Sequence, residues 1–289
     1  MVTGAVSDDL LRVRDSRRAL RDDLRAIRIV LRRELIRYGR DRLRMLAWLL
    51  QPLMWMLVMG TGLSSLVAQG DGGVDLKTFI YPGVCAMSIM FTSMFSAGSI
   101  VWDREFGFLR EMLVAPVSRS AIVIGKTLGG ALVATCQGTF ILVLAGLAGV
   151  PYDPVLMLTL LGEMFLGALA LTGFGVMMAA RFKSFQGYFA LMQMGMMPMM
   201  FLSGALYPLS GLPTWLGVLT RLNPFTYVVD LLRQAVFAHL DVGPAVAAAF
   251  NPGVTWNGWR VPVALELALV VVMGVGLLSV AIFRFNQSE

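Results

Sequence analysis

The sequence predicts an all-α integral membrane protein with six transmembrane helices, and three observations support this fold class. Of the 289 residues, 57% are hydrophobic and only 15% are charged, whereas soluble domains carry about 25% charged residues. Apolar stretches long enough to cross roughly 30 Å of hydrocarbon recur along the chain. The basic residues are also distributed unevenly around those stretches, in the way that fixes membrane orientation. Composition and span length together disfavour a water-soluble fold.

The predicted spans are six apolar stretches separated by short polar breaks. They cover residues 45–67, 79–101, 120–149, 155–180, 187–208 and 261–283. If the N-terminus is cytoplasmic, twenty of the 24 Lys and Arg residues fall on the inner side and four on the outer side. Because short loops rich in Lys and Arg stay in the cytoplasm, we expect both termini there, in a multi-pass protein of the plasma membrane.

Residues 1–44 are expected to form a unit that precedes the membrane domain of residues 45–289. This segment carries thirteen Arg, no Lys and seven acidic residues. Its aliphatic residues recur at helical spacing, which predicts an amphipathic helix lying along the inner membrane surface. An equally weighted alternative is a charge block that only fixes orientation. Nucleic-acid binding is disfavoured because stacking aromatics are lacking. The aliphatic stripe comprises Leu20, Leu24, Ile27, Leu31 and Leu35.

The stretch between the fifth and sixth predicted spans is apolar but broken by prolines. Pro208, Pro213 and Pro224 divide it, and Asn223 before Pro224 is a favourable helix start. We therefore expect short, non-spanning helices that dip into the outer leaflet, as is tolerated where such segments pack against protein. Residues 242–259 are expected to form an outer loop.

No catalytic set is recognisable. Gly125-Lys126-Thr127 imitates the end of a phosphate-binding loop, but that motif needs a glycine where this chain has Ser120. The sequence contains one histidine, His239, and lacks a cluster of metal ligands. We therefore expect a protein that is not an enzyme, holds no cofactor or metal of its own, and depends on a partner for any energy from ATP.

The fifth predicted span carries a methionine cluster around Pro198. Thioethers can bind Cu(I), but no Cys or His lies in this run, so a pliable lining for varied apolar substrates is favoured. Two carboxylates, Glu163 and Glu266, fall inside predicted spans, where charges are costly. Structural or gating roles are favoured for them; an ion-coupled secondary transporter that uses both is the alternative from another class. The candidate substrate path is Met192, Met196, Met199, Phe201 and Glu163.

The cytoplasmic segment after the second predicted span alternates charged and apolar residues. Asp103, Arg104 and Glu105 are followed by Phe106 and Phe108. A short helix of this kind can insert into a groove on a soluble partner. The alternative is an ordinary surface loop that happens to be helical.

Two stretches give the chain a resemblance to a known family. One carries Glu105, Leu113, Pro116, Arg119 and Lys126; the other is residues 201–234, where the elements SG, YP, LP, LNP-x-TY and D-x-x-R occur in order. On these residues the chain resembles the permease subunits of ABC-2 type exporters, especially those similar to daunorubicin and other antibiotic or lipid exporters.

The resemblance implies a half-transporter that pairs with a second permease and with two ATP-binding cassette subunits, which bind ATP and Mg. It implies export of a hydrophobic or amphipathic drug, antibiotic or lipid; a lipid-linked polysaccharide is the closest alternative cargo. It also implies an ATPase-coupling helix within residues 103–118 and an outer re-entrant gate within residues 208–234. The coupling residues would be Asp103, Arg104, Glu105, Phe108, Arg110, Glu111, Pro116 and Arg119, and the gate residues Pro208, Pro213, Trp215, Asn223, Pro224, Tyr227, Asp230 and Arg233.

Overall fold

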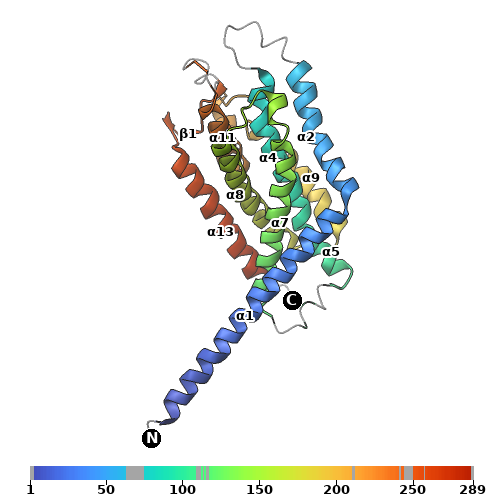
Figure 1. The fold of residues 1–289 in the computed structure, drawn as a ribbon, viewed down its shortest axis with the longest axis vertical. Helices are drawn as coiled ribbons and strands as arrows, with labels where there is room; N and C mark the ends of the chain where they lie inside the picture. Colours follow the sequence, from blue (N-terminus) through green and yellow to red (C-terminus); the bar gives the residue numbers. More distant parts are fainter. Residues whose placement is uncertain are drawn as a thin grey trace.

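The computed structural model describes residues 3–62, 75–108, 112, 114, 117–209, 212–240, 242–243, 250–256 and 258–287. These residues form a helical bundle from which one long helix projects (Figure 1). Within the described part of the chain, five helices are long and apolar enough to cross a membrane. The prediction of a mostly helical membrane protein is confirmed at this level.

Five of the six predicted spans coincide with these helices. They are α2 (Arg42–Gly62), α4 (Leu76–Ala97) continued by α5 (Ser99–Glu105), α7 (Arg119–Leu142), α8 (Pro154–Ala179) and α13 (Val263–Gln287). The fifth predicted span coincides with α9 (Phe185–Leu202), an 18-residue helix that contains Gln186, Gln193 and Pro198 and is not among the five. The arrangement with six spans therefore stays a prediction.

The helix starts follow from local capping. Asp75, Ser118, Asp153 and Ser184 each accept a hydrogen bond from a first-turn N–H, of α4, α7, α8 and α9 respectively. Such caps satisfy donors that the helix itself leaves unpaired. We call the end of the bundle that holds Ser118 and Ser184 the inner end, and the end that holds Asp75 and Asp153 the outer end.

Helix α4 is the centre of the bundle. It is buried along nearly its whole length, and it packs against α2, α7 and α8. Helix α13 packs on α8, whereas α2 packs on α4 (Figure 1). Helix α9 presents only one narrow stripe to its neighbours, because its buried residues are four apart: Tyr188, Met192, Met196 and Met200.

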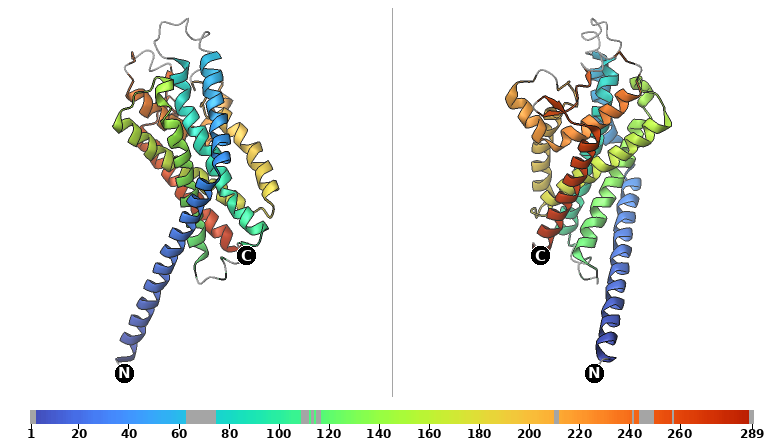
Figure 2. Two further views of the ribbon diagram at one scale, coloured as in Figure 1. Left: turned by 45° about the vertical axis from the view of Figure 1, so that its right-hand side comes forward. Right: turned by 90° about the vertical axis from the view of Figure 1, so that its left-hand side faces the viewer.

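Helix α1 (Thr3–Arg40) packs its second half along α7, while its first half projects beyond the inner end (Figure 2). Two glycines of α7 allow this approach: a Cβ at Gly125 would lie 3.0 Å from Val30 Cβ, and one at Gly129 would lie 3.1 Å from Glu34 Cβ. Small residues four apart let helices pack closely in this way. The packed face carries Val30 and Glu34, whereas Leu20 and Leu24 of the predicted stripe are 61% and 64% exposed.

Between α9 and α13, the described residues of the outer end include two short helices that precede β1. These are α10 (Thr214–Leu222) and α11 (Pro224–Ala238), and α11 packs against α4, α8 and α13. Short helices were predicted here; their insertion into the outer leaflet stays a prediction. The described part of the predicted 242–259 loop includes a two-residue antiparallel pairing of β1 (Thr255–Trp256) with β2 (Trp259–Arg260). The 3₁₀ helix η1 (Ala145–Ala148) follows α7.

Candidate functional site

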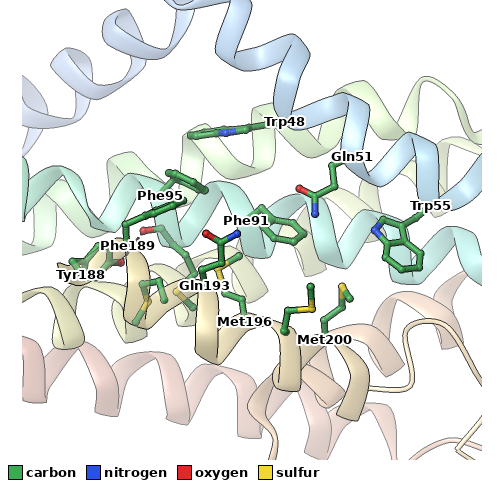
Figure 3. Close-up of a pocket in the computed structure, with 13 residues that line it drawn as sticks. Trp48, Gln51, Trp55, Phe91, Phe95, Tyr188, Phe189, Gln193, Met196 and Met200 are labelled. Atoms are coloured by element: carbon green, nitrogen blue, oxygen red, sulfur yellow. Dashed lines mark hydrogen bonds between the residues drawn. The ribbon is translucent and has the colours of Figure 1, made fainter. Parts of the chain in front are cut away.

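A groove of about 250 Å³ lies on the face of α4 between α2 and α9. Figure 3 shows side chains from these three helices facing one another across it. Its lining is aromatic and thioether, with two amide side chains and no charged group. We call it the aromatic–methionine groove. The lining residues are Trp48, Gln51, Trp55, Phe91, Met94, Phe95, Tyr188, Phe189, Met192, Gln193, Met196, Met197 and Met200.

Helical spacing brings the lining residues together. In α2, Trp48, Gln51 and Trp55 are three and then four residues apart, so they share one face. The Trp48 ring lies 4.7 Å from the Phe95 ring of α4, which in turn lies 5.0 Å from the Phe189 ring of α9. These contacts connect the three walls at one end of the groove.

The predicted substrate path is only partly gathered at this groove. Met192 and Met196 line it. Met199 packs against the core instead, and Phe201 is 44% exposed. Glu163 is buried in α8, away from the groove, with one carboxylate oxygen lacking a hydrogen-bond partner among the described residues.

Sequence reasoning missed the aromatic wall contributed by α2. The available signal was the spacing of Trp48, Gln51 and Trp55, which places a polar amide between two tryptophans on one helical face. Nothing in the sequence shows that this face meets the methionines of α9, because α2 and α9 are separated by more than a hundred residues.

The first predicted coupling residue, Asp103, points into the protein. It is 4% exposed, and its carboxylate lies 2.5 Å from both Lys126 Nζ and an Arg33 nitrogen. Lys126 Nζ also binds Glu34 at 2.6 Å and Ser99 Oγ at 2.9 Å. This buried charge cluster joins α1, α5 and α7. Its two acids and two bases balance, as burial of charge requires.

The next two predicted coupling residues bind other helices. An Arg104 nitrogen donates to the carbonyls of Phe182 and Ala180, at 2.8 and 3.3 Å, at the end of α8. Glu105 Oε2 accepts a hydrogen bond from the Phe185 N–H, at 2.8 Å, at the start of α9. The residues best placed to meet a partner are instead Phe106, Phe108 and Val114, which are 60%, 52% and 87% exposed.

Of the remaining predicted coupling residues, the structure describes Arg119. Arg119 begins α7 and is half-buried. Arg110, Glu111 and Pro116 lie outside the described residues. Ser118, which caps α7, donates from its N–H and its hydroxyl to the Asp23 carboxylate of α1, both at 2.8 Å. The segment 103–118 is therefore attached to α1 at its two ends.

The predicted gate residues divide into an exposed and a buried group. Pro213 and Trp215 of the α10 region are exposed, and Pro208 is half-buried. Asn223 caps α11, where Pro224 takes the first turn, and the Asn223 amide also donates to Met199 O at 2.7 Å. This last contact ties α11 to the end of α9.

The buried gate residues form a second polar cluster at the outer end. An Arg233 nitrogen donates to Gly204 O at 2.6 Å, and the guanidinium lies 4.4 Å from the centre of the Phe79 ring. Asp230 accepts from Val254 N at 2.9 Å, and Tyr227 donates to Arg221 O. Burial lowers the pKa of Arg233 to about 10, which leaves it charged at neutral pH.

Gln234 connects this outer cluster to α13. Its amide donates to Asp230 Oδ2 at 2.8 Å and to Glu266 Oε2 at 3.2 Å. The other Glu266 oxygen has no hydrogen-bond donor among the described residues. Within the same part of the chain, no three His, Cys, Asp or Glu side chains gather closely enough to hold a metal ion.

Comparisons with known proteins agree on one family. The family model for the ABC-2 type transporter matches residues 25–237. A putative transport permease, ycf38, of Cyanophora paradoxa is 29% identical over 64% of this chain and 65% of its own length. A probable multidrug ABC transporter permease, YbhR, of Escherichia coli K12 is 30% identical over 73% of this chain and 53% of its own length. The chain therefore spans less than two thirds of either relative. Nodulation protein J of Rhizobium leguminosarum bv. viciae is 27% identical over 77% of this chain and 84% of its own length.

Proposed function

This chain belongs to the ABC-2 type transporter family, and from that premise we propose that it is the permease subunit of an ATP-driven exporter of hydrophobic or amphipathic compounds. Members of the family are membrane transporter subunits rather than catalysts. We place the protein in a bacterial plasma membrane with both termini in the cytoplasm. The aromatic–methionine groove is the observation that carries the proposal.

The chemistry of the groove fits an uncharged or weakly polar cargo. Aromatic and thioether walls stabilise apolar surface by removing it from water. Methionine side chains also adapt to differently shaped partners, which suits a range of cargos. Gln51 and Gln193 supply donors and acceptors without charge. The groove therefore favours drugs, antibiotics or lipids over ions.

The size of the groove supports a role for a second permease subunit. Sites that enclose drug-sized ligands have volumes of roughly 300–1,000 Å³, and this groove offers about 250 Å³. Met54 of α2 and Met194 of α9, which are next in sequence to the lining residues Trp55 and Gln193, are 47% and 71% exposed. A second permease, identical or related, facing α2 and α9 would enlarge and close the groove.

Energy would come from a separate ATP-binding cassette subunit that binds ATP and Mg. The exposed apolar residues Phe106, Phe108 and Val114 of the segment 103–118 offer a surface for it. Closure of the ATPase dimer would then move that segment and, through it, the helices of the groove.

Coexpression with an ATP-binding cassette subunit encoded by an adjacent gene tests this proposal. We expect the two proteins to copurify and a hydrophobic fluorescent cargo to stimulate ATP hydrolysis. Trp48→Ala should raise the cargo concentration for half-maximal stimulation roughly tenfold, because one stacking wall is lost. Trp259→Ala, which removes a tryptophan that is 54% exposed outside the groove, is the matched control. Failure to copurify, or equal effects of the two variants, would contradict the proposal.

A lipid-linked polysaccharide is the second candidate cargo. The observation in its favour is the combination of flat aromatic rings with two amide side chains, because sugars stack on such rings and hydrogen-bond to such amides. Competition between a hydrophobic drug and a lipid-linked oligosaccharide in the same ATPase assay separates the two. Stimulation by the oligosaccharide alone would favour this second candidate.

A further inference from the structure

We propose that Glu105 is a positioning residue that transmits movement of the segment 103–118 to α9, the wall of the groove that carries its methionines. This inference rests on the proposed function, because it concerns how an ATPase bound to that segment would act on the groove. It assigns to Glu105 a contact within the permease, in place of contact with the ATPase.

Three consecutive residues at the end of α5 reach three different parts of the bundle. Successive residues of a helix point about 100° apart. Asp103 accordingly binds Lys126 of α7 and Arg33 of α1, Arg104 binds carbonyls at the end of α8, and Glu105 binds the first N–H of α9. A shift of this turn of helix therefore reaches all these elements at once.

Arg104 and Glu105 hold opposite ends of the connection between α8 and α9. The cation binds carbonyls where α8 ends, and the anion binds an N–H where α9 begins. Both charges suit the helix end that they meet, since helix C-termini are partly negative and N-termini partly positive. The start of α9 is thereby linked to α5 by one hydrogen bond from a backbone N–H to an exposed carboxylate.

Helix α9 is held near both ends, and its residues from Tyr188 to Met200 include the wall of the groove that α9 contributes. Near the start, the Tyr188 hydroxyl donates to Met94 O at 2.8 Å; near the end, Asn223 binds Met199 O at 2.7 Å. Close packing reinforces the inner attachment, because a Cβ at Gly98 would lie 2.8 Å from the Tyr188 ring. A displacement at the inner end would therefore tilt α9 about its outer attachment and change the width of the groove.

Substitutions at Phe185 can remove the hydrogen bond to Glu105 separately from the loss of the Phe185 ring. Phe185→Pro deletes the N–H that donates a hydrogen bond to Glu105. Proline is favoured at the first helical position, so the helix itself should form. The preceding residue, Ser184, already has the extended conformation that a following proline requires, with φ −121° and ψ 139°. Phe185→Ala removes the same aromatic ring and keeps the N–H, so it is the matched control.

The experiment compares these two variants, each with and without Glu105→Ala, in the permease–ATPase complex reconstituted into proteoliposomes. The readout is the number of cargo molecules transported per ATP hydrolysed. We expect Phe185→Pro to lower this ratio roughly tenfold relative to Phe185→Ala. Glu105→Ala should lower the ratio in the Phe185→Ala background and have no further effect in the Phe185→Pro background.

A change in docking alone would lower hydrolysis and transport together and leave their ratio unchanged. Equal ratios in Phe185→Pro and Phe185→Ala, or equal effects of Glu105→Ala in both backgrounds, would overturn the link in a complex that otherwise works. Absence of an active complex with the wild-type chain would instead overturn the proposed function, and the link with it.

A distance measurement reports the movement directly. Spin labels at Gln186→Cys in α9 and Leu158→Cys in α8 occupy exposed positions that do not line the groove, with the exposed Cys136 replaced by Ser. We expect ATP and vanadate to change the distance between the labels in the Phe185→Ala background and not in the Phe185→Pro background. The same nucleotide-dependent change in both would overturn the link.

Discussion

The two buried polar clusters of this protein, one at each end of the bundle, are built differently. At the inner end, Glu34 and Asp103 face Lys126 and Arg33, so acids and bases are equal in number and each is paired. At the outer end, Asp230 and Glu266 form no ion pair with a Lys or Arg among the described residues, and the Arg233 guanidinium binds a backbone carbonyl. One Glu266 oxygen and the Arg233 Nε lack hydrogen-bond partners among the described residues.

This difference in pairing indicates that the inner cluster is rigid and that the outer cluster can rearrange. Removing one member of a balanced buried pair leaves an uncompensated charge, which makes such clusters rigid. A cluster with unpaired polar atoms has less to lose when its geometry changes. We infer that the inner cluster holds α1, α5 and α7 as one body, whereas the outer cluster is the end at which side chains exchange partners.

Lys126→Met should produce the largest effect on stability. It would leave Glu34 and Asp103 buried with one partly exposed arginine between them, at a cost of about 3–5 kcal/mol in the free energy of unfolding. Titration of the purified protein with SDS in mixed micelles measures this change. Lys183→Met, at an exposed position, should cost less than about 0.5 kcal/mol. Similar changes in the free energy of unfolding for both variants would contradict the inference that the inner cluster is rigid.

Arg233→Leu should have an intermediate effect. The change leaves the buried Gly204 carbonyl without its donor and removes the cation from the Phe79 ring, which together cost about 2–3 kcal/mol. The same titration measures the loss, with Arg221→Leu on the neighbouring α10 as control. A loss as large as that of Lys126→Met would show that the outer cluster is as rigid as the inner one.

Glu266→Gln should have the smallest effect and offers the sharpest comparison. The amide keeps the shape of the side chain, and Glu266 has no ion-pair partner among the described residues, so the free energy of unfolding should change by less than about 1 kcal/mol. Asp103→Asn replaces a carboxylate by an amide at the inner cluster, where Lys126 and Arg33 would be left to share the single carboxylate of Glu34, and should cost about 3 kcal/mol. Equal costs for the two variants would contradict the distinction between the clusters.

The sequence predicted most of the helices because apolar length and capping residues are local properties. The spans predicted at 155–180 and 261–283 agree closely with α8 and α13. The assignment of Asp103 to a partner-binding helix rests on the alternation of charged and apolar residues and on the family resemblance, and it stays a prediction. The burial of Asp103 depends on Lys126, which also binds Glu34, 92 residues earlier in the chain. That contact needs the close approach of α1 to α7 at Gly125 and Gly129.

The groove could be predicted only in part because it also depends on contacts between helices that are distant in the sequence. Met192 and Met196 were selected because a run of methionines is visible in the sequence, and both line the groove. The partners of that run, Trp48 and Trp55, come from α2, and only the packing of both helices on α4 brings them opposite. Gly125-Lys126-Thr127 shows the converse: a sequence that imitates a phosphate loop serves here to pack two helices.

The thioethers of the groove also make it sensitive to oxidants. Oxidation converts a flexible apolar methionine into a polar sulfoxide, and methionine sulfoxide reductases reverse the change. Met197 is 58% exposed, whereas Met192 and Met196 are each 6% exposed. Peroxide would therefore modify the rim of the groove before its floor.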